Sequence, residues 1–264
     1  MNINFTSIQF DIRDNVACIT LNRPEAANSI NQDMAIALMR AAMQCSEDPA
    51  IRAVIITGTG SMFCSGGDLK EFAAQGERLP YYMKETTAYL HAAISHLTRM
   101  VPPVVAAVNG AAAGAGMSLA CACDIVVAAE SARFTMGYTR AGLSPDGSST
   151  YFLPRIVGLR RALELTLTNR VLSAQEALEW GIVTRVVPDV EVLAQAQAIA
   201  VQLAAGPTKA LGASKRLLHS GCSETLETQM EHESQTIASM AHTTDTSEGI
   251  AAFLEKRAAK YRGQ

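Results

Sequence analysis

The sequence lacks the excess of positive charge that nucleic-acid-binding and membrane-surface proteins usually carry. Its 264 residues include 22 Lys and Arg against 25 Asp and Glu, which gives a net charge of −3 and a pI near 6.0. The chain therefore has no overall positive field that would attract polyanions. The composition is still compatible with a local basic pocket. Charged residues make up 18% and hydrophobic residues 48%, so the chain can bury the core of one large α/β domain or of two smaller ones.

The sequence also lacks a long uninterrupted apolar run and a basic-then-apolar leader. Its longest apolar stretch, Val101–Leu119, is interrupted by Pro102, Pro103, Asn109, Gly110, Gly114 and Gly116. We therefore expect no membrane span. The six cysteines contain no CxxC pair, and Cys121 and Cys123 lie in an apolar run. These features predict core thiols in a soluble, cytoplasmic protein of a reducing compartment.

Short apolar runs alternating with helical patterns indicate a mostly parallel sheet with crossover helices. Two β-rich runs predict a hairpin, Ile8–Asp11 with Val16–Leu21. Runs that are apolar on both faces predict buried strands at Ala53–Thr57, Val104–Val108 and Asp124–Ala129. Helices are expected over about residues 29–45, 80–99 and 117–123 and over most of the chain after residue 150. Capping-box spacings predict two of the helix starts, Ser29–Gln32 and Ser173–Glu176.

Two glycine-rich loops follow buried strands and lead into predicted helices. The first spans Met62–Leu69 and the second spans Asn109–Gly116. Glycine permits a close approach between backbone and ligand, and two such loops on neighbouring strands can aim two N–H donors at one point. Each loop taken alone is equally typical of a tight turn. Neither has the Gly-Lys-Ser/Thr of a phosphate-binding loop or the pattern of a dinucleotide site.

These loops, together with the sequence NRPE at Asn22–Glu25, resemble the crotonase (enoyl-CoA hydratase/isomerase) superfamily. Further similar segments are PPVVAAVNGAAAGAG, CDIVVAAESARF, GLSPDG, LPRIVG, AQEALEWGIV and FLEKRAAKYRG, so the resemblance covers nearly the whole chain. It implies a ββα spiral core over residues 1–200 and a helical oligomerisation region over residues 201–264. It also implies homotrimers or dimers of trimers that bind an acyl-CoA thioester, with coenzyme A as part of the substrate and no separate cofactor.

The resemblance also implies roles for individual residues. The backbone N–H groups of Ser65 and Ala115 are expected to hold the thioester oxygen. Residues 72–95 are expected to shape the acyl pocket. The expected coenzyme A contacts are Arg23, Ala26, Ala27, Cys64, Gly67, Asp68, Leu69, Lys70, Phe253 and Lys256, the last two across a subunit interface. Each of the cations is also consistent with an ordinary surface charge.

The two glutamates that serve hydratases of this superfamily are absent. Ser118 and Tyr138 stand at their positions, and hydroxyl groups are poor substitutes for carboxylates in water activation at neutral pH. Asp146 lies in GLSPDG, where several isomerases and a 4-chlorobenzoyl-CoA dehalogenase resembling this chain carry an Asp. It is therefore the expected acid/base of an isomerase, acting on a double bond or a strained ring, or the nucleophile of a dehalogenase. The sequence pattern alone is also consistent with Asp146 as the N-cap of a helix that begins near Ser148.

His91 occupies the helix position of a histidine base in that dehalogenase, although a lone helical histidine is more often structural. The other histidines form no metal-ligand pattern, and no metal is expected. Hydratase activity and a non-catalytic CoA-ester binder remain alternatives to the isomerase. A nucleic-acid-binding role is disfavoured by the acidic pI.

Overall fold

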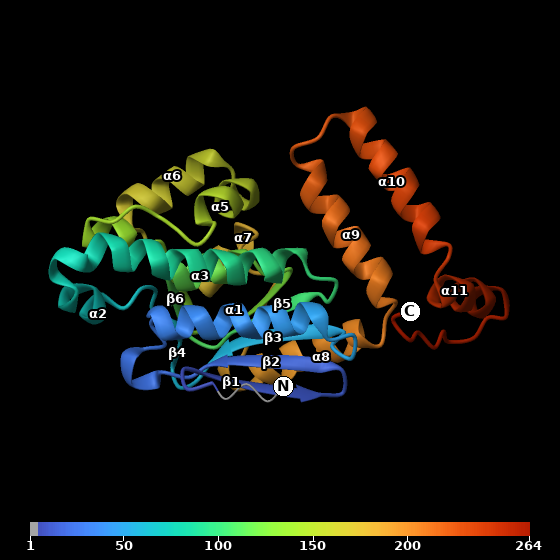
Figure 1. The fold of residues 1–264 in the computed structure, drawn as a ribbon, viewed down its shortest axis with the longest axis horizontal. Coiled ribbons are helices and arrows are strands. Elements are labelled where there is room, and N and C mark those ends of the chain that lie inside the picture. The colour runs from blue at the N-terminus through green and yellow to red at the C-terminus, as the bar shows by residue number, and fades with distance from the viewer. Residues whose placement is uncertain (1–4) are drawn as a thin grey trace.

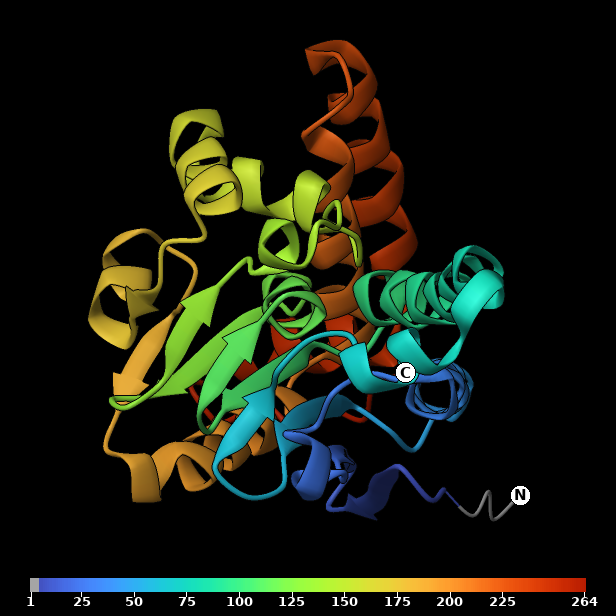
Figure 2. The ribbon, with the colours of Figure 1, turned by 90° about the vertical axis from the view of Figure 1, so that its left-hand side faces the viewer.

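The chain forms two β-sheets covered by helices (Figures 1 and 2), and the computed structural model describes residues 5–264. Within these residues the first sheet has the strand order β1-β2-β3-β5-β7-β10 and the second has the order β4-β6-β8-β9. The strands are β1 (Ile8–Arg13), β2 (Val16–Leu21), β3 (Ala53–Gly58), β4 (Met62–Cys64), β5 (Val104–Val108), β6 (Ala111–Ala113), β7 (Ile125–Ala129), β8 (Arg133–Thr135), β9 (Leu172–Ser173) and β10 (Arg185–Val187).

Helices cover the sheets and make up most of the second half of the chain (Figure 1). They are α1 (Gln32–Glu47), α2 (Leu69–Ala74), α3 (Leu79–Arg99), α4 (Ala115–Cys121), α5 (Ser149–Val157), α6 (Leu159–Thr168), α7 (Ala174–Glu179), α8 (Val192–Ala204), α9 (Thr208–Gly221), α10 (Leu226–Met240) and α11 (Thr244–Leu254). Short 3-10 helices lie at Pro24–Ala26, Gly76–Arg78, Tyr138–Ala141 and Asp189–Glu191. The predicted α/β fold with C-terminal helices is confirmed.

The first sheet confirms the predicted hairpin and the predicted parallel strands. β1 and β2 pair antiparallel, whereas β2, β3, β5, β7 and β10 pair in parallel. Both faces of β3 and β5 are buried, with α1 and α3 packed together along the sheet and α8 packed against β3 and β5 (Figure 1). Burial on both faces explains why these strands are uniformly apolar rather than alternating.

The second sheet brings the two glycine-rich loops together. Each long inner strand continues into a short strand of the second sheet, β3 into β4 and β5 into β6. Because β4 and β6 pair in parallel, with Met62 opposite Ala111, their carboxyl ends lie at the same edge of the sheet. The loop after β4 and the loop after β6 both begin at that edge.

The two predicted capping boxes have different outcomes. At α7 the Ser173 side chain accepts from the Glu176 N–H and the Glu176 carboxylate accepts from the Ser173 N–H, as predicted. At α1 the prediction of Ser29 as the cap is wrong, because Asn31 Oδ1 accepts from the Met34 N–H at 3.0 Å. The helix therefore begins at Gln32, three residues after Ser29.

We predicted that the core ends near residue 200. That residue lies within α8, which packs on β3, β5 and β7 and so belongs to the core. The helices that leave the core begin with α9. Helices α9 and α10 project from the body as an antiparallel pair, and α11 lies beyond them (Figures 1 and 2). No helix within residues 5–264 is both long and apolar enough to cross a membrane.

The cysteines are free thiols, and Cys45, Cys64 and Cys121 are buried. Burial raises the pKa of Cys64 and of Cys121 to about 12, so both stay protonated near neutrality and behave as core residues.

An ion pair between buried Lys215 and partly exposed Asp124 fastens α9 to the core. Lys215 Nζ donates to Asp124 Oδ2 and to the Leu97 carbonyl, both at 2.7 Å. The same Asp124 oxygen accepts from the Val104 N–H at 2.7 Å. One lysine therefore links α9 with the end of α3 and with the starts of β5 and β7.

Lys215→Met is expected to lower the free energy of unfolding by about 2 kcal/mol, the scale of lost hydrogen bonds to a charged group, since the partly exposed Asp124 keeps its bond from Val104. Urea-induced unfolding measures this change. The control is Lys209→Met, an exposed lysine of the same helix, with an expected change within about 0.5 kcal/mol. Equal stability of the two variants would show that the ion pair does not fasten α9.

Candidate functional site

A mostly apolar cavity of about 130 Å³ lies where the two glycine-rich loops meet. The loops form one wall, α2 and α3 form another, and residues 137–146 form a third. Expected pocket residues 72–95 contribute Phe72, Met83, Thr86, Thr87 and Leu90. From Met83 onward these follow the i, i+3, i+4, i+7 spacing of one helix face. We call this space the central cavity.

The two loops touch through their backbones, and glycine is required at the contact. A Cβ on Gly116 would lie 2.3 Å from the Cys64 carbonyl oxygen. A Cβ on Gly66, which has φ +101°, would lie 3.0 Å from the Ala113 oxygen and 3.4 Å from the Ala115 nitrogen. No larger residue fits at Gly116 without moving a strand, so the glycines bring the loops to contact distance.

The backbone N–H groups of Gly67 and Ala115 in these loops donate to no acceptor among residues 5–264. Gly67 forms a parallel bridge with Ile30, in which the Ile30 N–H donates to Gly66 O at 2.7 Å and the Asp68 N–H donates to Ile30 O at 3.0 Å. A parallel bridge of this kind turns the N–H of Gly67 itself away from Ile30. Ala115 is the first residue of α4, where the helix offers its N–H no acceptor. Both residues line the central cavity.

Ser65 does not offer the donor that we expected from the sequence. Its N–H donates to the Ala27 carbonyl at 3.1 Å, so this group is already satisfied within the fold. Gly67, expected only as a coenzyme A contact, has the unpaired N–H instead. The pair of donors at the cavity is therefore Gly67 with Ala115, and Ser65 is a lining residue.

Asp146 lies in the cavity wall within a cluster of hydroxyl groups. The Tyr138 hydroxyl donates to Asp146 Oδ1 at 2.7 Å. Ser118 Oγ lies 2.9 Å from the Tyr138 oxygen and 3.1 Å from the Gly114 carbonyl. Burial, and then the charge of Asp146, raise the pKa of Tyr138 above its usual value. Tyr138 thus remains a hydrogen-bond donor to Asp146 near neutrality.

The carboxyl group of Asp146 does not cap α5. That helix begins at Ser149 after Ser148, and no side chain caps it. Instead, the Asp146 backbone carbonyl accepts from Ser149 N at 3.2 Å and from Ser149 Oγ at 2.8 Å. The capping alternative is therefore wrong, and the Asp146 side chain is available to the cavity. Among the described residues that line the cavity, Asp146 has the one carboxyl group.

Ser118 and Tyr138 lie beside Asp146, so the structure brings all three predicted residues together. Ser118 is fully buried, and its hydroxyl also lies 3.2 Å from the Asp146 carbonyl. His91 lies outside the lining. It is exposed on α3, and its Nε2 accepts from the Gly147 N–H at 3.2 Å.

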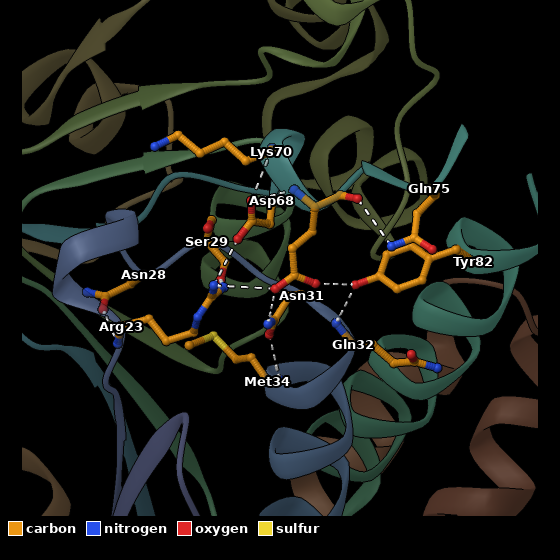
Figure 3. Close-up of polar contacts among 11 residues, drawn as sticks. Arg23, Asn28, Ser29, Asn31, Gln32, Met34, Asp68, Lys70, Gln75 and Tyr82 are labelled. Carbon is orange, nitrogen blue, oxygen red and sulfur yellow. Dashed lines mark hydrogen bonds and ion pairs between the residues drawn. The ribbon is translucent and has the colours of Figure 1, made fainter. Parts of the chain in front are cut away.

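The predicted coenzyme A contact Arg23 belongs to an internal polar network (Figure 3). It donates to Asp68 Oδ2 at 2.9 Å and to the Ser29 carbonyl at 2.7 Å. Asp68 also caps α2 by accepting from the N–H groups of Lys70 and Glu71. Burial alone would raise the pKa of Asp68, but the bonds from Glu71 and Arg23 outweigh it and lower this pKa. Arg23 and Asp68 therefore brace the first glycine loop, and their charges neutralise each other.

Glu71 extends this network to α1 and α3, a connection that sequence reasoning missed. Its carboxylate accepts from Asn31 Nδ2 and from the Tyr82 hydroxyl, both at 2.6 Å (Figure 3). The Asp68–Glu71 spacing predicts the cap of α2, but no local pattern indicates that Glu71 contacts Asn31 and Tyr82, which are distant in the sequence.

The remaining expected contacts fall into three groups. Leu69 lines the cavity and is 56% exposed, and Lys70 is exposed and extends away from the network (Figure 3). Ala26 and Ala27 are half-buried at the turn that supports Ser65, and Cys64 is buried. Phe253 and Lys256 lie at the end of α11, at the opposite end of the molecule from α2 (Figure 1). These last two do not line the cavity of their own chain.

Comparison with known proteins gives a consistent picture. Residues 11–264 match the family model described as enoyl-CoA hydratase/isomerase. A "Probable enoyl-CoA hydratase" of Rhodobacter capsulatus is 40% identical over 99% of this chain and 100% of its own. The "1,2-epoxyphenylacetyl-CoA isomerase" of Escherichia coli is 38% identical over 96% of this chain and 97% of its own. A putative enoyl-CoA hydratase/isomerase from Mycobacterium abscessus superimposes with a TM-score of 0.93 at 32% identity, covering 97% of this chain and all of that one.

Proposed function

Since the chain belongs to the enoyl-CoA hydratase/isomerase family, we propose that it isomerises an enoyl-CoA thioester with Asp146 as the acid/base. The observation that carries this proposal is the single carboxyl group among the described lining residues of the central cavity. Hydration needs one group to activate water and another to protonate carbon. Isomerisation returns a proton to a different carbon of the same molecule, so one carboxyl group is sufficient.

In the proposed reaction the thioester oxygen accepts hydrogen bonds from the N–H groups of Gly67 and Ala115. Removal of a proton from carbon moves negative charge onto this oxygen, forming an enolate. Fixed donors stabilise that charge without reorganisation, and each contributes roughly 10²–10³-fold in rate. Support comes from the unpaired state of both N–H groups and from the contact between their loops.

In the proposed proton transfer, Asp146 takes the proton from the α or γ carbon of the acyl chain. The electron pair of the broken C–H bond enters the conjugated enolate. The Asp146 carboxyl group then returns the proton to the other carbon, and the thioester C=O bond forms again. Tyr138 occupies Oδ1, which leaves Oδ2 for the substrate. A strained epoxide is the second substrate type that we propose, in keeping with the name of the Escherichia coli relative.

For the coenzyme A moiety, we propose contacts with the first glycine loop, with Leu69, and with Lys70, whose cation suits a phosphate. Phe253 and Lys256 can join this site only from a second copy, because α11 lies far from the cavity in one chain (Figure 1). We propose that helices α9 to α11 self-associate in trimers or dimers of trimers. Their exposed apolar side chains support this: Leu218, Leu226, Met230, Ile237, Ile250, Phe253 and Leu254.

Hydratase activity is the second candidate, supported by the name of the Rhodobacter capsulatus relative. Ser118 and Tyr138 stand at the glutamate positions. Their hydroxyl groups are hydrogen-bonded to each other and to Asp146. In that arrangement neither hydroxyl is a base for water. We therefore rank hydration below isomerisation.

The deciding experiment incubates the purified protein with a panel of CoA esters. The panel contains a 3-enoyl-CoA, 1,2-epoxyphenylacetyl-CoA, crotonyl-CoA and 4-chlorobenzoyl-CoA. Products are identified by mass spectrometry and chromatography. We expect kcat/KM for one of the two isomerisations to exceed that for crotonyl-CoA hydration by at least about 100-fold, the scale of a missing acid/base group. Faster hydration, chloride release, or tight binding without turnover of any ester would each contradict the proposal.

A further inference from the structure

The backbone that carries Asp146 has an unusual conformation. Gly147 and Ser148 follow it with φ angles of +59° and +66°, which is left-handed for two successive residues, the second of them not a glycine. Such a conformation persists only where surrounding contacts hold it. A Cβ on Gly147 would lie 3.0 Å from the Ser118 Cβ, so this turn is also pressed against α4.

Contacts from several directions hold this turn. Tyr138 holds the Asp146 carboxyl group, and Ser149 and Ser118 hold its backbone carbonyl. The N–H of the next residue, Gly147, has a different partner, which is His91 Nε2 on α3 at 3.2 Å. This is the one side-chain bond between α3 and the turn among residues 5–264.

The direction of this bond defines the state of the imidazole. Because the Gly147 N–H donates, Nε2 must be the unprotonated nitrogen, and the ring proton of neutral His91 lies on Nδ1. A nitrogen committed to a backbone N–H does not also take a proton from substrate. His91 also does not line the central cavity. It therefore supports the turn that carries Asp146 rather than contacting a substrate.

We propose that His91 is a positioning residue that sets the distance between Asp146 and the α3 wall of the central cavity. This inference rests on the proposed function, because it assigns Asp146 the proton transfer. The α3 side chains Met83, Thr86, Thr87 and Leu90 line the cavity where an acyl group would lie. His91 follows Leu90 directly, so the His91–Gly147 bond joins the wall beside the acyl chain to the residue that moves the proton.

The test compares two replacements of His91. In His91→Gln the side-chain amide oxygen reaches about as far as Nε2 and accepts the same bond. In His91→Asn the amide ends near the position of Nδ1 and falls short of Gly147. We expect His91→Asn to lower kcat by about 10–100-fold with KM changed less than about threefold, since a small misplacement of a catalytic group has this effect. We expect His91→Gln to recover kcat to within about threefold of the wild type by restoring the acceptor.

The controls separate this inference from the proposed function. His96→Asn alters a histidine of the same helix that makes no side-chain hydrogen bond in residues 5–264, and it is expected to leave kcat unchanged. Circular dichroism and acyl-CoA affinity confirm that each variant is folded. Wild-type kcat in His91→Asn, or equal losses in the Gln and Asn variants, would overturn the positioning role. Full activity of Asp146→Asn in the same assay would instead overturn the proposed function.

Discussion

Asp146→Asn is expected to lower kcat by about 10²–10⁴-fold, the usual contribution of general acid–base catalysis, while acyl-CoA affinity stays within about threefold of the wild type. Asparagine has nearly the same shape as aspartate, and its amide oxygen still accepts from the Tyr138 hydroxyl that now bonds Oδ1 at 2.7 Å. The amide cannot take up a proton from carbon. Initial rates give kcat, and titration with a saturated acyl-CoA gives the affinity.

A matched control is Asp33→Asn, which changes an exposed aspartate in the first turn of α1, away from the cavity. It is expected to keep wild-type kcat and affinity. If Asp146→Asn loses affinity as much as it loses rate, Asp146 contributes to binding rather than to proton transfer. If it loses neither, the cavity carboxyl group has no part in the reaction.

Much of the scaffold of this site follows from local sequence patterns. Strands such as Ala53–Thr57 and Val104–Val108 are apolar on both faces, and only strands buried between layers of helices have this composition. The glycine loops after them are equally clear, because backbone contact between loops excludes a Cβ at Gly116. Both patterns are compositions of short local segments, which can be read directly from the sequence.

The details of the site depend on pairings between distant segments, which local patterns do not show. The choice between Ser65 and Gly67 as donor is set by a bridge to Ile30 and a bond to Ala27, both from the segment that follows NRPE. The sequence predicts Arg23 as a phosphate ligand, yet its guanidinium forms an ion pair with Asp68. These outcomes require knowledge of which segments pack together.

The role of Asp146 is likewise not decided by the local sequence pattern. The sequence permits both a cap for α5 and a cavity carboxylate, because aspartate two or three residues before a helix suits both. The structure decides between them through the left-handed φ of Gly147 and Ser148, which begins the helix at Ser149 without a side-chain cap. The Tyr138 hydroxyl then engages the freed carboxyl group.

Ala115→Pro is expected to lower kcat/KM by about 10²–10³-fold through loss of one hydrogen-bond donor to the thioester oxygen. Proline has no N–H, and the first position of a helix is where proline is best tolerated. Ala115 is the first residue of α4, and Gly114 before it has no Cβ to clash with the proline ring. The substitution thus removes the proposed donor with little effect on the helix. Steady-state kinetics measures the loss, and circular dichroism verifies the fold.

Leu159→Pro serves as the control, because it places proline at the first position of α6, also directly after a glycine. Leu159 is exposed and does not line the central cavity. We expect this variant to keep kcat/KM within about threefold of the wild type, as a tolerated first-turn proline should. A folded Ala115→Pro protein with the same kcat/KM as Leu159→Pro would contradict the assignment of Ala115 as a donor. A loss confined to Ala115→Pro would mean that the thioester oxygen depends on the backbone of the second glycine loop.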